Sequence, residues 1–518
     1  MGVAARGGLG LRKHMTLFSQ PGSSPNRGGI LRIGTVAPLD APEPLTMRDP
    51  TSLLLVQLAG EYLAWPDPAF GLAPRLAAGW TTPDGISWTF FLRRGVSFQN
   101  GKTLDASDVV ASFQRLLDPS YASPALASLG SLLAPEGVVA QDSHTVVFRL
   151  NSAFVDFPYL VSAFNANAVI LPRDYRVGSF LSRPAGTGPF VLSSYVEGSG
   201  ASFQANPSYW DSGFPYLDGV QVRFFPTLWQ ALEALARGEV DLVPHVEATY
   251  LGIISSNQDV LVRSWPSTSY VALAMRTDLP PFDDVHLRLA VASCIDREGA
   301  VRGILLGHGE LANDHVFAPS FPLSRLALQA VPQRNLDLAA ASRYLSMAGR
   351  PRGFAVELVT ENDPRTVAFG ELVAANCQKV GIDVRLNVQP RAAYLGNLPT
   401  TSSSVVPMWL SVQFGLTPMA AGGTPSQLIL PSYLSSSLEN ASRWQNPEFG
   451  SVFGDYVEEV DPSLRAVAAR DLASLQNSQV PVVIAFWPDE LCAQGMALRG
   501  VPSGPAGLLD LRGVWLAA

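Results

Sequence analysis

The sequence predicts an α/β fold, because segments with strand patterns and segments with helix patterns follow one another along most of the chain. The strand-like segments are short, and they either alternate apolar with polar residues or are rich in β-branched residues. The helix-like segments repeat apolar residues every three or four positions. The chain has 518 residues, of which 47% are hydrophobic. This length allows roughly two to four domains with a large core.

The individual elements follow from these patterns and from their end signals. Strands are predicted at 31–36, 87–92, 145–150, 220–225, 240–243, 270–275, 354–360, 384–388 and 482–487. Helices are predicted at 51–64, 228–237, 339–348, 366–380 and 464–476, together with one after Asp105 and one that starts at 286. A side-chain oxygen of Asp105 or Ser107 can cap the first of these last two helices. Gly238 and Gly349 end theirs, since glycine takes the left-handed conformation without a Cβ penalty.

The composition disfavours several classes of function. Basic residues number 36 and acidic residues 44, a formal net charge of -8, so a nucleic-acid-binding role is not expected. No stretch of 18 residues is uniformly apolar, so we expect no membrane-spanning helix. Cys294, Cys377 and Cys492 are far apart in sequence and form no C-x-x-C pair. They are expected to be buried small apolar side chains rather than disulfides or zinc ligands.

No catalytic motif is complete. Residues 101–103 (GKT) end like a phosphate-binding loop, but the glycine that such a loop needs at 96 lies at Gly95. Residues 186–188 (GTG) lack the third glycine of a dinucleotide loop and are better interpreted as a tight turn. His308 and His315 are seven residues apart on a predicted loop, which is weak spacing for a metal site. We therefore predict no enzyme activity, no metal and no cofactor.

The first residues lack the features of an export signal. Residues 1–26 contain no continuous apolar run of about 7–15 residues, and no cysteine near the start can carry a lipid. Residues 1–29 are expected to form a flexible leader, since 22–29 read GSSPNRGG. Two interpretations stay open: the export signal is missing from this sequence, or the protein stays inside the cell.

Six segments in a fixed order carry a family resemblance from about residue 30 to the end. They are 72–119, which includes LAPRLAAGW and LRRGVSF; 186–190 (GTGPF) with 206–218; 231–241; 280–297; 337–353 leading to 380–384; and 446–449 continuing to 498–501. Together they resemble the bacterial extracellular solute-binding proteins of family 5. These proteins are the peptide, dipeptide and nickel receptors of ABC importers.

The resemblance implies a periplasmic-binding-protein-like fold of the class II type. Such a fold has two lobes joined by two hinge strands, with an extra subdomain on lobe I and the ligand between the lobes. Mapped onto this sequence, the parts are lobe I at 30–270 plus 481–518, the extra subdomain at about 75–185, lobe II at 271–480, and hinge strands near 269–274 and 482–487.

The resemblance also implies a function. The chain is expected to be a monomeric solute-binding component of an ABC-type importer that binds a peptide-like or other small amphipathic solute. Its partners would then be the permease subunits in the membrane, and its location would be the cell envelope. Two alternatives stay open: a cytoplasmic homologue recruited to specialised metabolism as a ligand sequesterer or enzyme, and a signalling receptor for a peptide.

The region expected to face the ligand is unusually poor in charge. Peptide-binding relatives place an acidic residue for the ligand's ammonium after the strand at 384–388, but 405–418 (VVPMWLSVQFGLTP) contains no acid, and 392–438 contains no charged residue or histidine. One interpretation is a buried region rich in serine and proline. The other is a neutral cleft wall for an uncharged, amphipathic or aromatic ligand. Its residues would be Trp409, Ser411, Gln413 and Phe414.

Two further positions complete the predicted ligand site. Tyr270 starts the first predicted hinge strand and either faces the cleft or packs in the core. If the ligand carries an ammonium group, its acidic partner must come from elsewhere, for instance from Asp40, Glu43 or Glu61. Of these three we include Asp40 in the predicted site.

Overall fold

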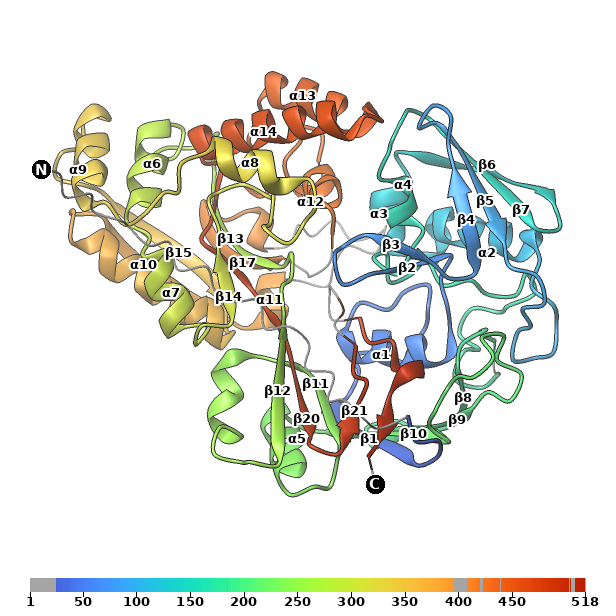
Figure 1. Cartoon of the computed structure of the whole chain (residues 1–518). Coiled ribbons are helices and arrows are strands. Elements are labelled where there is room, and N and C mark those ends of the chain that lie inside the picture. Colours follow the sequence, from blue (N-terminus) through green and yellow to red (C-terminus); the bar gives the residue numbers. More distant parts are fainter. Residues whose placement is uncertain are drawn as a thin grey trace, which may run out of the picture.

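The computed structural model describes residues 25–517, apart from 184, 396–407, 420–422, 438, 503 and 505–507. Its helices and strands form two lobes (Figure 1). The predicted leader lies outside the described residues as far as residue 24. Its described end is attached to lobe I: the Arg27 guanidinium donates to the Gly213 carbonyl at 2.6 Å, and the Gly28 amide donates to the Tyr216 carbonyl at 2.8 Å.

Lobe I is built on a seven-stranded mixed sheet in which β1 is central and runs parallel to β10 and β11. In sheet order the strands are Val260–Trp265 (β12), Glu490–Gly495 (β20), Leu242–Val246 (β11), Ile30–Val36 (β1), Gly219–Phe225 (β10), Gly200–Ala205 (β9) and Phe190–Val196 (β8). The helices of this part are Pro50–Ala59 (α1) and Leu228–Ala236 (α5). Strand β20 brings the C-terminal part of the chain back into this sheet, between β11 and β12.

A separate four-stranded antiparallel sheet forms the extra part of lobe I, at the right of Figure 1. Its strands, in sheet order, are Ala77–Thr81 (β4), Ser87–Leu92 (β5), Thr145–Leu150 (β7) and Leu133–Asp142 (β6), and its helices are Ala106–Leu117 (α2), Ala125–Leu129 (α3) and Phe157–Leu160 (α4). Of the two predicted caps for α2, Asp105 is the one found, with Asp108 completing a reciprocal capping box.

Lobe II is built on a five-stranded sheet at the left of Figure 1. In sheet order its strands are Asp383–Gln389 (β16), Ala355–Glu361 (β15), Phe414–Met419 (β17), Tyr270–Met275 (β13) and Val482–Ile484 (β18). The helices of this lobe are Val285–Ser293 (α6), Arg297–Gly303 (α7), Ser324–Ala330 (α8), Leu338–Met347 (α9), Pro364–Gln378 (α10), Arg391–Leu395 (α11), Pro425–Ser432 (α12), Pro447–Glu458 (α13) and Pro462–Gln479 (α14). Short two-stranded pairings add Ala64–Pro66 (β2) with Leu72–Pro74 (β3), Gly309–Leu311 (β14) with Phe486–Pro488 (β19), and Leu498–Arg499 (β21) with Trp515–Leu516 (β22).

The two faces of the five-stranded sheet have different neighbours. Along β13, Val271, Leu273 and Met275 belong to the apolar core that α6, α9 and α10 complete within lobe II. Tyr270 and Ala272 point the other way and belong to a second core, which continues into lobe I. Because side chains alternate across a strand, one strand serves both cores. The face that carries Tyr270 is therefore directed toward the boundary between the lobes.

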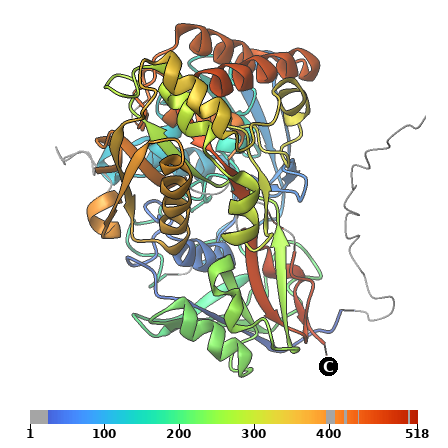
Figure 2. The ribbon, with the colours of Figure 1, turned by 90° about the vertical axis from the view of Figure 1, so that its left-hand side faces the viewer.

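The chain passes between the two large sheets twice. Residues 266–269 connect β12 in lobe I to β13 in lobe II, and Asp489 connects β19 to β20 in lobe I. Figure 2 shows the strands that run between the upper and lower parts of the molecule. The predicted domain boundaries stay a prediction, but β18 pairs with β13, which favours a second crossing near Asp489 rather than near residue 481.

Most predicted elements are found close to the predicted positions, with two informative differences. The predicted helix 51–64 ends at Ala59, because Gly60 takes an extended conformation and Glu61 then reaches Arg75. The predicted strand 482–487 is two strands, β18 and β19, which pair with different partners on either side of Ala485.

Glu61 is the centre of a buried polar network that uses several residues of the family-like motifs. Its carboxylate accepts hydrogen bonds from Arg75 at 2.8 Å, Thr187 at 2.9 Å, Tyr209 at 2.8 Å and the Trp210 indole at 2.7 Å. A buried carboxylate with four donors is well compensated. Tyr209 and Trp210, which lie in the family-like segment 206–218, therefore hold this charge.

The lobes are in direct contact. Asp156 precedes α4 in lobe I and is 1% exposed, and its carboxylate pairs with Arg465 of α14 at 2.5 Å. Asp156 also accepts a short hydrogen bond from Ser426 of α12. Nearby, the Val155 amide donates to the Val457 carbonyl at 2.7 Å. The described conformation is therefore one in which the lobes are closed on each other.

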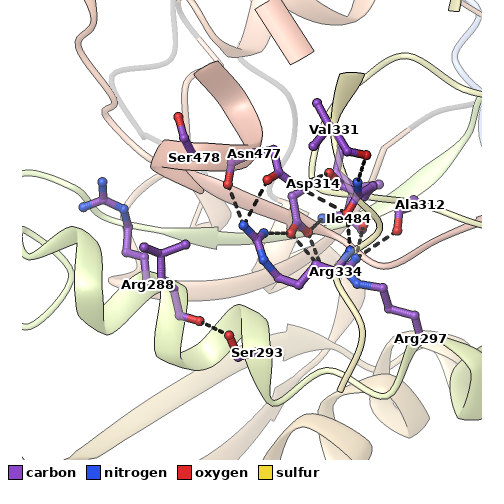
Figure 3. A network of polar contacts seen from close by, with 12 residues as sticks. Arg288, Ser293, Arg297, Ala312, Asp314, Val331, Arg334, Asn477, Ser478 and Ile484 are labelled. Carbon is purple, nitrogen blue, oxygen red and sulfur yellow. Dashed lines mark hydrogen bonds and ion pairs between the residues drawn. The ribbon is translucent and has the colours of Figure 1, made fainter. Parts of the chain in front are cut away.

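Asp314 anchors strand β18 inside lobe II (Figure 3). Its side chain is fully buried and pairs with Arg297 through two contacts of 2.8 Å and with Arg334 through a shorter one. It also accepts from the Ile484 amide at 3.1 Å, and Arg297 donates to the Ile484 carbonyl at 2.6 Å. Arg334 extends the network to Asn477 at the end of α14. Three separate segments thus bond directly to one carboxylate, and a fourth, the end of α14, is attached to it through Arg334.

Replacing Asp314 by alanine leaves two guanidinium groups in the interior without their shared counter-charge. We expect the free energy of unfolding to fall by about 3–5 kcal/mol, measured by urea denaturation followed by circular dichroism. Asp383→Ala is the matched control, because the Asp383–Arg385 pair lies on the surface and should matter little. Equal stability of the two variants would contradict the anchoring role.

His315, next to Asp314, is held in its neutral form. It is 1% exposed, and its Nε2 atom is buried without a hydrogen-bond partner. Burial lowers its pKa to about 4; Asp314 opposes this shift and Arg297 adds to it. Between about pH 6.5 and pH 4 the unfolded chain therefore binds a proton at this position that the folded chain does not. Folding stability from this group is present above about pH 6.5 and is lost as the pH falls toward 4.

The variant His315→Asn should show a shallower loss of thermal stability between pH 6.5 and 4.5 than the parent protein. Burial raises the pKa of Glu361 and Glu439, which acts in the opposite sense in both proteins, so the difference between the two melting curves isolates His315. His144→Asn is the control, because His144 is only partly buried and its ring contacts the exposed Ser143 hydroxyl. An unchanged slope in His315→Asn would exclude this histidine as the source.

Candidate ligand-binding site

A small cavity lies on the face of the five-stranded sheet that is directed toward lobe I. Its volume is about 20 Å³, enough for one water molecule. Ala272, Ala274 and Val482 supply apolar wall, and the polar groups come from Tyr270, Trp409, Thr417, Ser432, Tyr433 and Glu439. An apolar wall with a few convergent polar groups is the usual lining of a ligand site, although such sites have volumes of about 300–1,000 Å³.

Two of the six predicted site residues meet at this cavity. Tyr270 is 2% exposed, its hydroxyl lies 3.2 Å from that of Tyr433, and its ring packs edge-on against Trp487. Burial raises the pKa of Tyr270, so its hydroxyl keeps its proton. Trp409 is 6% exposed, and its indole Nε1 is buried without a hydrogen-bond partner. The structure thus unites Tyr270 and Trp409, which are far apart in sequence, and leaves one donor free for a guest.

Three neighbours of Trp409 do not line the cavity. The exposed Ser411 hydroxyl donates to the Met408 carbonyl at 2.9 Å, and the Gln413 amide donates to the Pro280 carbonyl. Phe414 is fully buried on the opposite face of the sheet, where its ring lies 5.0 Å from that of Phe282. The idea that Phe414 forms part of a cleft wall therefore needs correction: strand alternation turns it into the core of lobe II.

The acids suggested by the sequence do not reach the cavity lining. Asp40 is exposed in the loop after β1. Glu43 is buried in lobe I, where it accepts from the Tyr175 hydroxyl at 2.7 Å and the Gly178 amide at 2.8 Å. Glu61 has the four donors described above. Glu43 and Glu61 therefore hold lobe I together, and Asp40 stays a prediction without a contact to the site.

The carboxylate that does line the cavity is Glu439, which sequence reasoning missed. Burial raises its pKa, while Arg48 of lobe I, on the other side of the boundary, lowers it. Glu439 is the first charged residue after the uncharged stretch 392–438. The end of the uncharged stretch could have pointed to Glu439. The sequence alone did not indicate that the chain folds back to Trp409 at this residue.

A larger opening also lies at the boundary between the lobes. It has a volume of about 560 Å³ and lies between Ala69 of lobe I and residues 319–329 around α8. Its lining is mainly apolar, with Arg325 and Gln329 among the polar members. Because it is open to solvent, it cannot exclude water from a guest as the smaller cavity can. We therefore take the cavity at Trp409 as the candidate site.

The comparisons with known proteins identify the family. The model for bacterial extracellular solute-binding proteins, family 5 (middle region), matches residues 71–427, well over half of the chain. The chain belongs to this family. Family membership confirms the prediction of a solute-binding protein rather than an enzyme, and it favours that role over a recruited cytoplasmic homologue.

Curated relatives and solved structures agree with this assignment. The chain is 25% identical to heme-binding protein A of Haemophilus influenzae over 79% of this chain and 78% of that protein. It is 26% identical to the peptide transport periplasmic protein SapA of Salmonella typhimurium over 86% of this chain and 84% of that protein. The peptide-bound DppA structure from Helicobacter pylori is 22% identical and covers 95% of this chain and 99% of that one, with a TM-score of 0.77. CtaP of Listeria monocytogenes is 19% identical. That match covers 95% of this chain and 100% of the CtaP chain, with a TM-score of 0.81.

These structural matches confirm the two-lobe fold. Within the part of the chain that the structure describes, no helix combines the length and the apolar character that crossing a bilayer requires. The three cysteines are free and buried, as expected from their spacing.

Trp409 supports local structure as well as lining the cavity, because it packs with Val359, Tyr394 and Leu410. We expect Trp409→Ala to lower the free energy of unfolding by about 3 kcal/mol or more, and Trp409→Phe to retain most of the parent stability. Thermal unfolding followed by circular dichroism measures both. A melting temperature for Trp409→Ala equal to that of the parent would show that the tryptophan is not packed in solution.

Proposed function

We propose that this protein is the solute-binding component of an ABC-type importer and binds a peptide-like or other small amphipathic solute between its lobes. The observation that carries the proposal is the cavity at Trp409, which combines aromatic wall, hydroxyl groups and a carboxylate at the lobe boundary. Relatives named for such ligands support it, including the dipeptide-binding protein of Pseudomonas aeruginosa, 22% identical over 79% of this chain. The family match supports it as well.

The cavity itself suggests which chemical groups a ligand needs. The Trp409 indole donates a hydrogen bond, the Glu439 carboxylate accepts one, and the Thr417 hydroxyl can do either. A guest that places a carbonyl oxygen beside an N–H group satisfies both, as a peptide unit does. The sequence predicted a wholly neutral wall. The wall is neutral along Trp409 and Tyr270, but Glu439 adds one acid to it.

Ligand entry requires the lobes to separate, since the closed cavity has room for one water molecule only. Opening would break the pair between Asp156 and Arg465 and the backbone contact of Val155 with Val457. A murein tripeptide-binding protein solved in an unliganded open form has a TM-score of 0.76 with this chain. We propose the same hinge motion here, about residues 266–269 and 489.

The remaining assignments follow from the importer role. The closed form of a monomeric protein would dock onto permease subunits in the membrane, and the protein would act in the cell envelope. Residues outside the cavity, such as Asp40, are candidates for contacts that form only with ligand present.

Native mass spectrometry of the purified protein tests the proposal directly. We expect a small molecule to co-purify and to be released when the protein is unfolded. Trp409→Phe should retain several-fold less of it, because the indole donor is lost. Ser411→Ala is the control, since Ser411 is exposed and bonds within its own turn. The proposal fails if no molecule co-purifies and calorimetric titration with pooled di- and tripeptides gives no heat of binding.

A further inference from the structure

A second group of buried polar atoms without hydrogen-bond partners lies at the lobe boundary, around Glu361. This residue ends β15 and lies on the same face of the strand as Val359, which packs against Trp409. Glu361 is fully buried, and both carboxylate oxygens lack a hydrogen-bond partner. A buried carboxylate in that state is unfavourable by several kcal/mol. Such a group in a native protein requires an explanation.

Lobe I contributes a second carboxylate to the same place. Glu247 follows β11, and its Oε2 atom is also buried without a hydrogen-bond partner. Glu247 raises the pKa of Glu361, so the two carboxyl groups are near each other, and Asp363 raises the pKa of both. Burial is the larger cause of both shifts. Two acids from opposite lobes are therefore held near each other.

The neighbouring charges do not compensate these two acids. Asp363 raises the pKa of both acids and Glu490 raises that of Glu247, whereas Arg365 and Arg391 lower the pKa of both. Arg391 lies 3.4 Å from Glu361, but its side chain is 68% exposed, so this pair is largely screened by water. Four carboxylates thus face two guanidinium groups. The imbalance favours the arrival of a positive charge.

The acids are connected to the cavity by Tyr394. This fully buried side chain packs against Trp409, and its hydroxyl lies 3.1 Å from that of Thr417, which lines the cavity. Glu361 also raises the pKa of Tyr394, so the carboxylate and the phenol are near each other. A guest that extends from the cavity along this face of the sheet would reach the acids.

We propose that Glu361 and Glu247 form a subsite for a cationic group of the ligand, an ammonium or a guanidinium. The inference rests on the proposed function and specifies its ligand class: an amphipathic solute with a positive charge at the end away from Glu439. Such a group has several N–H donors for the three oxygens that lack partners. Among the described residues no group of three or more acids, histidines or cysteines is placed to hold a metal ion.

The position of the subsite also links the cation to lobe closure. Glu361 belongs to lobe II and Glu247 to lobe I, so a cation between them bonds to both lobes at once. Without it, closure brings two like charges together; with it, closure joins opposite charges. The same guest without its charge would therefore bind less tightly and close the lobes less completely.

The test uses two N-acetylated tripeptides of nearly equal size, acetyl-Ala-Phe-Arg and acetyl-Ala-Phe-citrulline, so that the guanidinium is the one cationic group by which they differ. Calorimetric titration of the full chain is expected to give at least tenfold tighter binding of acetyl-Ala-Phe-Arg. In Glu361→Gln and in Glu247→Gln the preference should fall below threefold. Glu357→Gln is the matched control, because Glu357 lies on the same strand but is exposed. It should keep the full preference.

The outcomes separate this inference from the proposed function. Equal binding of the two tripeptides, or an unchanged preference in both glutamine variants, overturns the cationic subsite while the binding function stands. Failure of both peptides to bind at millimolar concentration overturns the subsite and contradicts a peptide-like ligand. Thermal unfolding of each variant shows whether it is folded, and Glu247→Gln provides a second measurement if Glu361→Gln is unstable.

Discussion

The buried carboxylate of Asp314 is the interaction on which the geometry of the site depends. It fixes β18 through the Ile484 amide, and β18 in turn is the edge partner of β13. Strand β13 carries Tyr270 toward one core and Val271 toward the other. A charge in the interior is favourable only with its partners present, and here Arg297 supplies them from α7. The position of the cavity wall is thus determined by an ion pair that lies outside the cavity lining.

Several buried polar groups at the boundary between the lobes lack hydrogen-bond partners, as His315 Nε2 does inside lobe II. Glu61 inside lobe I has four donors, whereas Glu361, Glu247 and the Trp409 indole at the boundary lack partners. Folding alone would favour replacing such groups by apolar ones. In the proposed binding role, a guest that bonds to these atoms would offset the cost of burying them.

The sequence predicted the fold far better than the site. Strands β5, β7 and β13 were predicted to the residue, because their β-branched and aromatic alternation is strong. Strand β17 was missed, since Gly415 and Pro418 interrupt its pattern. Trp409 was found from the absence of charge around it, but its meeting with Tyr270 depends on the pairing of β13 with β17. The position of Glu439 at the cavity depends on how the chain folds back toward Trp409, which no local sequence pattern predicts.

The buried pair of Asp156 and Arg465 has a consequence for how cargo is sensed. A clamp with its own ion pair can shut while it is empty, so a closed outline does not by itself report a bound guest. In the proposed import role, a membrane partner could then not recognise cargo from shape alone. The difference would have to lie in dwell time: a loaded clamp stays shut longer, because the guest adds its own bonds to those of the latch.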